Sequence, residues 1–400
     1  MKKLNADKIF VILAFLGIYL LSTGVSFAIF NQFKKVTVPK GGPGITTEED
    51  LLVDISGPKT AECPLNGKMF TELEKERWLE KRPLFVMIEN HEEARPQSGL
   101  LKADVIYEAV AEGGITRFGT VYYCGAVAKE EIIGPVRSAR TYFLDWASEY
   151  GPPLYIHVGG AHCDPNTSEG CLNGGKADAL GQIGDYGWEG ENDLNQFSLG
   201  YPTFWRDYER IGHTVATEHT MYSTTEKLWQ VGEKRDWTNE DPEGEDWQTN
   251  FTKWSFKDDA GGLEKGDGGK IEFVFWEGHG QYKVVWEYDK ENNKYKRFNG
   301  GKPHLDLSTN EQLTSKNVVV QFAKESPAND GYPGNIHLLY GTTGEGKALV
   351  FQDGQTIKAE WSKSSRKGRT QFYTESGEEI KFVRGHIWIE ILPTGTEIKY

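Results

Sequence analysis

Short apolar runs bounded by glycine, proline and polar residues dominate the chain between residues 80 and 160. Their length and their content of Val, Ile, Phe and Tyr are typical of buried strands. We therefore expect strands at 84–89, 104–111, 115–124 and 154–158. Gly113 and Gly114 stand between the second and third runs, which predicts a hairpin there.

The spacing of apolar residues becomes helical in the segment from Ser138 to Tyr150. Five apolar residues recur at intervals that place them on one side of a helix. They are Tyr142, Phe143, Trp146, Ala147 and Tyr150. Ser138 is a suitable N-cap, and Gly151-Pro152 is a typical helix stop. The pattern predicts a helix with one buried face.

Polar residues and glycine prevail at 161–200 and 230–268, which we expect to be long surface loops. Beyond residue 270 the apolar runs are short and frequent, as in a sheet. They lie at 271–276, 282–288, 318–322, 347–352, 356–361 and 387–392. Asp353-Gly354 between two of these runs predicts a tight hairpin turn.

The N-terminal region has the pattern of a membrane anchor. Ile9 to Phe30 is a stretch of 22 uncharged residues, long enough to cross the hydrocarbon core as one helix. Lys2, Lys3 and Lys8 precede it and favour a cytoplasmic N-terminus. The alternative is a cleaved signal peptide, because Ser26-Phe27-Ala28 resembles a cleavage site.

Either alternative places the rest of the chain outside the cytoplasmic membrane. Residues 1–35 form the tip and anchor, and 36–61, rich in Pro and Gly, form a flexible stalk. The fold class expected beyond the stalk is α+β. We expect a mixed α/β domain at 62–230, an acidic linker at 231–268 and a β-rich domain at 269–400.

The net charge of the chain indicates which classes of macromolecule it can bind. The chain has 45 Lys and Arg against 59 Asp and Glu, a net charge of −14. The excess of acidic groups repels polyanions, and no Lys/Arg-rich run offsets it. Nucleic acid is therefore not an expected partner.

The chain contains an even number of cysteines, at Cys63, Cys124, Cys163 and Cys171. Three pairings are possible, and disulfides persist outside the cytoplasm. Cys163 and Cys171 bracket a short loop, which favours a local bridge and leaves Cys63 to pair with Cys124. Zinc is the alternative, because His157 and His162 lie nearby, but neither C-x₂-C nor H-x₃-H spacing occurs. No metal site is expected.

Several short motifs are distributed along both halves of the chain. They are Arg82-Pro83-Leu84, Glu89-Asn90, Ala94-Arg95-Pro96-Gln97-Ser98-Gly99, Gly134-Pro135-Val136-Arg137, Gln352-Asp353-Gly354 and Trp388-Ile389-Glu390. In these motifs the chain resembles the YerB-like family of bacterial envelope proteins. The resemblance implies an α+β fold and an anchored, lipoprotein-like surface location, but no settled activity. The chain departs from the family in its apolar anchor, which replaces a lipid-modified cysteine, and in the length of its two polar loops.

Three carboxylates are candidate catalytic groups. Regular alternation along the second strand places Glu108 and Glu112 on the same face as Ile106 and Val110. Burial raises the pKa of a carboxyl group, which suits a general acid, and paired carboxylates cleave glycosides. Glu89 is then the second carboxylate. The alternative is that these glutamates form structural ion pairs with arginines.

Arginines and histidines define a candidate binding site. Arg137, Ser138 and Arg140 stand at the expected start of the helix, where backbone N–H groups attract a carboxylate or phosphate. Alternatively, Ser138 caps the helix and the arginines pair with Glu108 or Glu112. The full candidate set is Asn90, Arg95, Arg117, Arg137, Ser138, Arg140, His157 and His219.

These features favour a non-catalytic cell-envelope module that binds a cell-wall polymer, a peptide or an envelope protein. The alternative is a peptidoglycan-cleaving enzyme that uses the buried carboxylates. No cofactor is expected in either case. We expect the chain to contact the membrane through Ile9 to Phe30.

Overall fold

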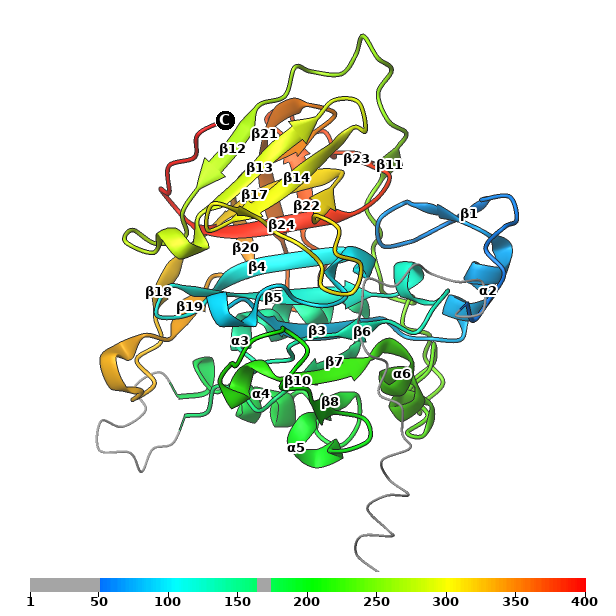
Figure 1. The fold of residues 1–400 in the computed structure, drawn as a ribbon, viewed down its shortest axis with the longest axis vertical. Coiled ribbons are helices and arrows are strands. Elements are labelled where there is room, and N and C mark those ends of the chain that lie inside the picture. The colour runs from blue at the N-terminus through cyan, green and yellow to red at the C-terminus, as the bar shows by residue number, and fades with distance from the viewer. Residues whose placement is uncertain (1–50, 164–173) are drawn as a thin grey trace, which may run out of the picture. The chain divides into compact units, whose positions relative to one another are not determined.

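The computed structural model describes residues 51–163 and 174–400 and is built around a ten-stranded mixed sheet (Figure 1). The strand order is β22-β21-β20-β17-β24-β4-β5-β3-β7-β8. In chain order the strands are β3 Leu84–Glu89, β4 Val105–Glu112, β5 Ile115–Tyr122, β7 Leu154–His157, β8 Asp193–Asn195, β17 Asn317–Ala323, β20 Gly344–Gln352, β21 Gln355–Lys363, β22 Gln371–Thr374 and β24 Ile387–Pro393.

Strand β24 joins the N-terminal and C-terminal parts of this sheet. It pairs in parallel with β17 on one side and with β4 on the other. Its residues from Ile387 to Leu392 are all buried, as expected of a central strand covered on both faces. The described residues on either side of 231–268 therefore belong to one compact unit. The expected domain boundaries stay a prediction.

The strands expected from the hydrophobic pattern are confirmed, with small shifts at their ends. Both expected hairpin turns are confirmed as well. Gly113 and Gly114 have φ of +53° and +79°, and Asp353 and Gly354 have φ of +53° and +67°. Two consecutive residues in the left-handed region are the mark of a two-residue turn whose twist matches the strands.

A second sheet packs against the first and contains three strands that the pattern did not reveal. It has the order β12-β13-β14-β15, with β16 also paired to β14. Its strands are β12 Lys270–Phe273, β13 Val284–Asp289, β14 Lys294–Asn299, β15 Lys302–Pro303 and β16 Thr314–Ser315. Strand β14 buries Tyr295, Arg297 and Asn299. Because two of these three inward residues are polar, the strand has no apolar periodicity.

The predicted helix at 138–150 is shorter than expected. Helix α3 spans Thr141–Ala147 and continues as the 3₁₀ helix η5, Ser148–Tyr150. The predicted face is confirmed, since all five of its apolar residues are buried. The predicted N-cap is wrong: Arg140, not Ser138, occupies the cap position, and its side chain makes no capping hydrogen bond. Ala139 instead forms a β-bridge with Gly160, and its N–H donates to the Gly159 carbonyl.

The expectation of a surface loop throughout 161–200 is wrong. This segment contains α4 Ala179–Asp185, β8 and α5 Gln196–Leu199. Asp178 and Asn195 accept backbone N–H groups at the starts of the two helices. Polar residues that favour loops also favour helix caps, and this explains the error.

The remaining helices and strands are short. They are α2 Glu72–Leu79, α6 Thr225–Glu233, β1 Ala61–Glu62, β2 Met69–Phe70, β6 Ile132–Ile133, β9 Trp205–Arg206, β10 Met221–Thr224, β11 Phe256–Lys257, β18 Glu325–Pro327, β19 Leu338–Tyr340 and β23 Phe382–Val383.

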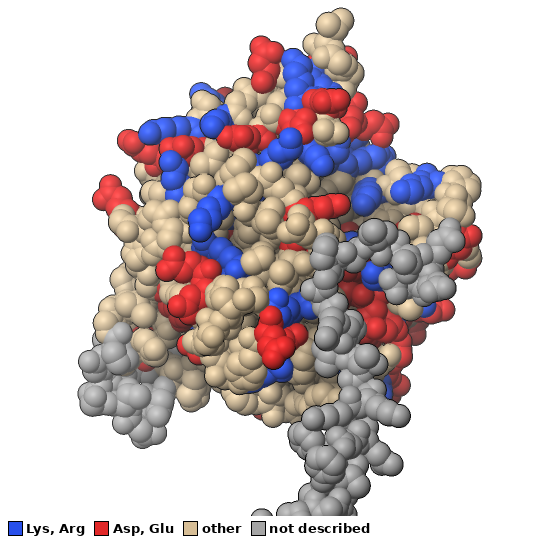
Figure 2. Space-filling model, in the orientation of Figure 1, with Lys and Arg blue, Asp and Glu red and all other residues tan. Residues whose placement is uncertain are grey.

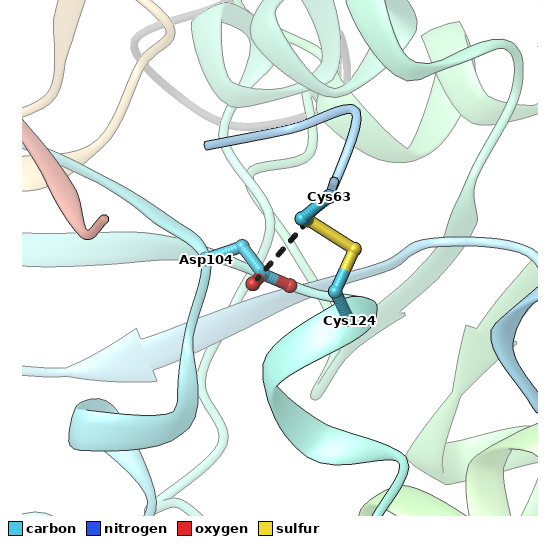
Figure 3. Close-up of side chains that lie close together, drawn as sticks. All are labelled: Cys63, Asp104 and Cys124. Carbon is cyan, nitrogen blue, oxygen red and sulfur yellow. Dashed lines mark hydrogen bonds between the residues drawn. A yellow bond between two sulfur atoms is a disulfide. The ribbon is translucent and has the colours of Figure 1, made fainter. Parts of the chain in front are cut away.

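The predicted disulfide between Cys63 and Cys124 is confirmed (Figure 3). The carboxylate of Asp104 lies beside it, 3.9 Å from the Cys63 sulfur, and accepts the backbone N–H groups of Tyr123 and Gly125. Burial raises the pKa of Asp104 to about 6. The disulfide and the carboxylate together fix the segment after β1 to the end of β5.

Three predictions lie partly or wholly outside the described residues. They are the anchor at Ile9 to Phe30, the stalk at 36–61, which is described only from residue 51, and the bridge from Cys163 to Cys171, since Cys171 is not among those residues. Within 51–163 and 174–400, none of the helices has the length and apolar character needed to span a bilayer.

Candidate functional site

Several strands of the large sheet end at the same edge. Strand β5 is antiparallel to both β3 and β4, so β3 and β4 run in the same direction, and β7 and β8 run parallel to β3. Their last residues are Glu89, Glu112, His157 and Asn195. Ligands of open α/β sheets bind beyond the carboxyl ends of parallel strands. This edge is therefore the natural place for a site.

A bulge in β4 separates the two glutamates that the sequence placed on one face. The pairing of β4 with β5 shifts between Val110 and Glu112. Arg117 pairs with Ala109, so its side chain lies on the face of the sheet opposite that of Glu108. The Arg117 guanidinium contacts Glu112 at 3.4 Å. Glu112 thus shares the Arg117 face, and the expectation that Glu108 and Glu112 share a face is wrong, because the extra residue reverses the alternation.

Glu108 belongs to a group that we call the sealed cluster: Glu108, Arg297 and Glu390. Arg297 Nη2 lies 2.5 Å from Glu108 Oε2, and its Nη1 lies 2.6 Å from Glu390 Oε1. All three side chains have no exposed surface, and the guanidinium lies 4.3 Å from the ring centre of Trp388. The sealed cluster connects β4, β14 and β24 and is inaccessible to a ligand.

The sealed cluster carries fewer charges than its residues suggest. Burial, only partly offset by Arg297, raises the pKa of Glu390 well above its ordinary value, and the neighbouring Glu108 raises it further. Glu390 therefore tends to keep its proton beside Arg297. A protonated carboxyl group adds no unpaired charge to the buried cluster.

The groups at the sheet edge form the strand-end cluster, which we define as Glu89, Glu112, Arg117, Arg137, Arg140 and His219. Arg140 contacts Glu112 directly, as expected from the sequence, and Arg117 and His337 lie 3.4 and 3.5 Å from it. Burial raises the pKa of Glu112, but Arg117, His337 and Arg140 outweigh burial and hold it below its ordinary value. Glu112 is therefore ionised.

Arg137 projects from this cluster with its terminal nitrogens free. Its Nε lies 2.5 Å from Glu89 Oε2, while among the described residues no acceptor receives a hydrogen bond from its two Nη groups. The side chain is 24% exposed. Burial opposes ionisation of Glu89, yet His219 and the guanidinium groups of Arg117 and Arg137 lower its pKa to about 2. The ionised Glu89 thus contacts the Arg137 guanidinium at Nε and leaves its two Nη groups, which we call the fork, open to a ligand.

The remaining predicted site residues have structural partners. His157 is buried, with Nδ1 2.6 Å from the Gly159 carbonyl and Nε2 2.6 Å from Asp193. The backbone carbonyl of Ser138 accepts from Arg117. Arg95 donates to Asn90 and to the carbonyl of Gln281. The edge therefore gathers Arg117, Arg137, Arg140 and His219, whereas Asn90, Arg95 and His157 are engaged elsewhere.

The catalytic hypothesis is weakened by these environments. A glycosidase needs one carboxyl group whose pKa is raised and which reaches the substrate. Glu108 is sealed, and the pKa values of Glu89 and Glu112 are lowered. None of the three candidates combines access with the proton that a general acid must donate.

Sequence reasoning missed an aromatic residue beside the edge. Phe197 on α5 is 74% exposed, and a Cβ built on Gly159 would lie 3.1 Å from its ring. Gly159 also accepts the N–H of Ala139 and so lies next to the segment that carries Arg137. The only signal in the sequence was an aromatic residue inside a polar segment.

Comparisons with known proteins agree with the resemblance seen in the sequence. Residues 70–238 match the model described as "Protein of unknown function (DUF3048) N-terminal domain", and residues 271–389 match its C-terminal domain. "Putative lipoprotein YerB" of Bacillus subtilis (strain 168) is 27% identical over 347 residues, which cover 86% of this chain and 90% of that protein. The crystal structure of the YerB protein from Bacillus subtilis has the same fold, with a TM-score of 0.66 and 24% identity over 85% of this chain and 100% of that one.

Proposed function

The chain belongs to the DUF3048 family, and we propose that it is an envelope-anchored binding protein that recognises carboxylate or phosphate groups of a cell-wall polymer at the strand-end cluster. The relative described as a lipoprotein supports an envelope location. The apolar stretch from Ile9 to Phe30 and the Cys63–Cys124 disulfide support export of the folded part.

The free fork of Arg137 is the observation that carries this proposal. A guanidinium group binds a carboxylate or phosphate through two parallel hydrogen bonds when its Nη groups are available. Glu89 holds Nε and so orients the fork before a ligand arrives. A preoriented donor loses less conformational entropy on binding than a mobile surface arginine.

The charge of the surroundings fits the same ligand class. The strand-end cluster contains three arginines and two ionised glutamates, so it has an excess of positive charge despite the net charge of −14. On the face drawn in Figure 2, the described acidic and basic side chains are interspersed, without a broad basic patch. Recognition of an anion is then local. The exposed ring of Phe197 adds an apolar surface suited to the C–H face of a sugar.

The test is retention of the purified full chain on peptidoglycan sacculi. The chain is pelleted with intact sacculi and with sacculi stripped of phosphate polymers, and soluble fragments are recorded by mass spectrometry. We expect retention without fragments. We expect Arg137→Ala to weaken retention at least tenfold, and Lys358→Ala, which removes an exposed charge on β21, to have no effect.

The outcomes separate the alternatives. Retention on stripped sacculi identifies wall-peptide carboxylates as the ligand, and retention on intact sacculi alone identifies a phosphate polymer. Fragment release would support the enzyme alternative. Equal retention of Arg137→Ala and the unmodified protein would refute the proposed site.

A further inference from the structure

We propose that His91, Glu93 and His219 form a binding site for one divalent transition-metal ion, with Zn²⁺ as the best match. His91 and Glu93 come from the N-cap and the body of the 3₁₀ helix η2, Glu92–Ala94, which follows β3. His219 ends the 3₁₀ helix η7, Thr217–His219, which precedes β10. One ligand atom from each lies within 4.8 Å of the others. The inference does not depend on binding of a wall polymer.

The separation of His219 and Glu93 is close to that in a loaded site. His219 Nε2 lies 3.8 Å from Glu93 Oε2, whereas two ligands of a tetrahedral Zn²⁺ lie about 3.3 Å apart. Glu93 is 53% exposed, so its side chain is free to make this small approach. The His91 and His219 rings are stacked at 4.7 Å with planes 10° apart. One ring must rotate so that both lone pairs meet at one point.

One unsatisfied buried nitrogen supplies an independent reason. His219 is 5% exposed, and its Nδ1 has no hydrogen-bond partner, although it faces Glu89 Oε2, the atom that also contacts Arg137, at 3.6 Å. A metal ion on Nε2 would fix the proton on Nδ1, and Nδ1–H would then donate to Glu89. A carboxylate behind a metal-bound histidine is the usual arrangement in zinc sites, because it orients the ring.

Metal binding requires His91 to give up a hydrogen bond. Its Nδ1 accepts the backbone N–H of Glu93 at 3.3 Å, and binding a metal through either ring nitrogen removes that acceptor. The chemistry of the ligands selects the ion: two imidazoles and one carboxylate suit zinc and its neighbours, whereas Mg²⁺ and Ca²⁺ prefer oxygen ligands only. Three protein ligands leave a coordination position open.

Another group of described residues meets the same distance criterion and is not a metal site. Cys63, Asp104 and Cys124 lie within 4.8 Å of one another. The two sulfur atoms are joined in the disulfide, so neither is a thiolate that could bind a metal.

The test is titration of Zn²⁺ into the full chain, purified without a histidine tag and stripped with chelator, using a competing chromophoric chelator. We expect one ion per chain. Glu93→Gln and His91→Gln should each weaken binding at least tenfold, and both keep side chains of similar size on a partly exposed loop. His213→Gln, an exposed histidine outside the cluster, is the matched control and should bind like the unmodified protein.

A second readout guards against misfolding of a variant. Thermal unfolding of the metal-free variants should match that of the metal-free parent, and added Zn²⁺ should raise the melting temperature of the parent and of His213→Gln but not of Glu93→Gln or His91→Gln. Absence of binding by the parent, or undiminished binding in both Glu93→Gln and His91→Gln, would overturn the site.

Discussion

The sealed cluster and the strand-end cluster use the same residue types on opposite faces of β3, β5 and β4, with opposite consequences. In the first, Arg297 lies between Glu108 and Glu390 and all three are removed from solvent. In the second, Arg137 is held by Glu89 on one side and remains open on the other. Glutamate–arginine pairing therefore does not by itself mark a binding site. The pair can bind a ligand only when its guanidinium group is accessible.

Charge balance separates the two clusters further. In the sealed cluster, burial raises the pKa of Glu390 and so favours its uncharged form. In the strand-end cluster both carboxylates are ionised and a third arginine is left in excess. The first arrangement stabilises the junction between β4, β14 and β24, and the second attracts an anion.

The largest expected effect is loss of stability on removing the arginine of the sealed cluster. In Arg297→Met, Glu108 and Glu390 remain buried without a cation, and this should lower the free energy of unfolding by about 3–5 kcal/mol. Urea unfolding followed by tryptophan fluorescence measures the loss. A decrease below about 1 kcal/mol would mean that the cluster is more hydrated than the structure shows.

The matched control replaces the whole cluster. In Glu108→Leu/Arg297→Met/Glu390→Leu no charge is left to bury, so most of the lost stability should return. If the triple variant is as unstable as Arg297→Met, packing rather than charge accounts for the effect.

An intermediate effect is expected at Glu112. Glu112→Gln weakens the charged contacts with Arg117 and Arg140 and should cost about 2 kcal/mol at neutral pH. Because the folded protein lowers the pKa of Glu112, this contribution is complete above the ordinary carboxyl pKa of 4.5 and is lost as the pH falls below it. Unfolding of the variant and its parent at pH 7 and pH 3 should show the difference shrinking in acid; a constant difference would contradict the linkage.

The smallest effect on stability is expected at the open fork. Arg137→Lys keeps the positive charge beside Glu89 but removes the two parallel donors, so unfolding should change by less than about 1 kcal/mol while retention on sacculi falls. Measuring both quantities on the same preparation tests the contrast with Arg297→Met. Equal losses of stability in the two variants would contradict the conclusion that only the sealed cluster is structural.

The sequence revealed what depends on local order along the chain. The runs that became β3, β4, β5 and β7 could be identified because they are mainly apolar and buried almost throughout, and a short apolar run is a local property of the sequence. The glycine turns, the buried face of α3 and the Cys63–Cys124 bridge were accessible for similar reasons. The helix cap at Arg140 and the elements within 161–200 were not, since Ser, Asn and Asp suit caps and loops equally.

Only the tertiary structure decided which of the predicted site residues share a face. A single bulge moved Glu112 to the side opposite Glu108, and β14, which carries Arg297, has too few apolar residues to be recognised. The insertion of β24 between β17 and β4 brings Glu390 to Glu108 from the far end of the chain. The sequence thus determined the strands and the stock of glutamates and arginines, whereas their pairing was decided by contacts between distant segments, which leave no periodic trace in the chain.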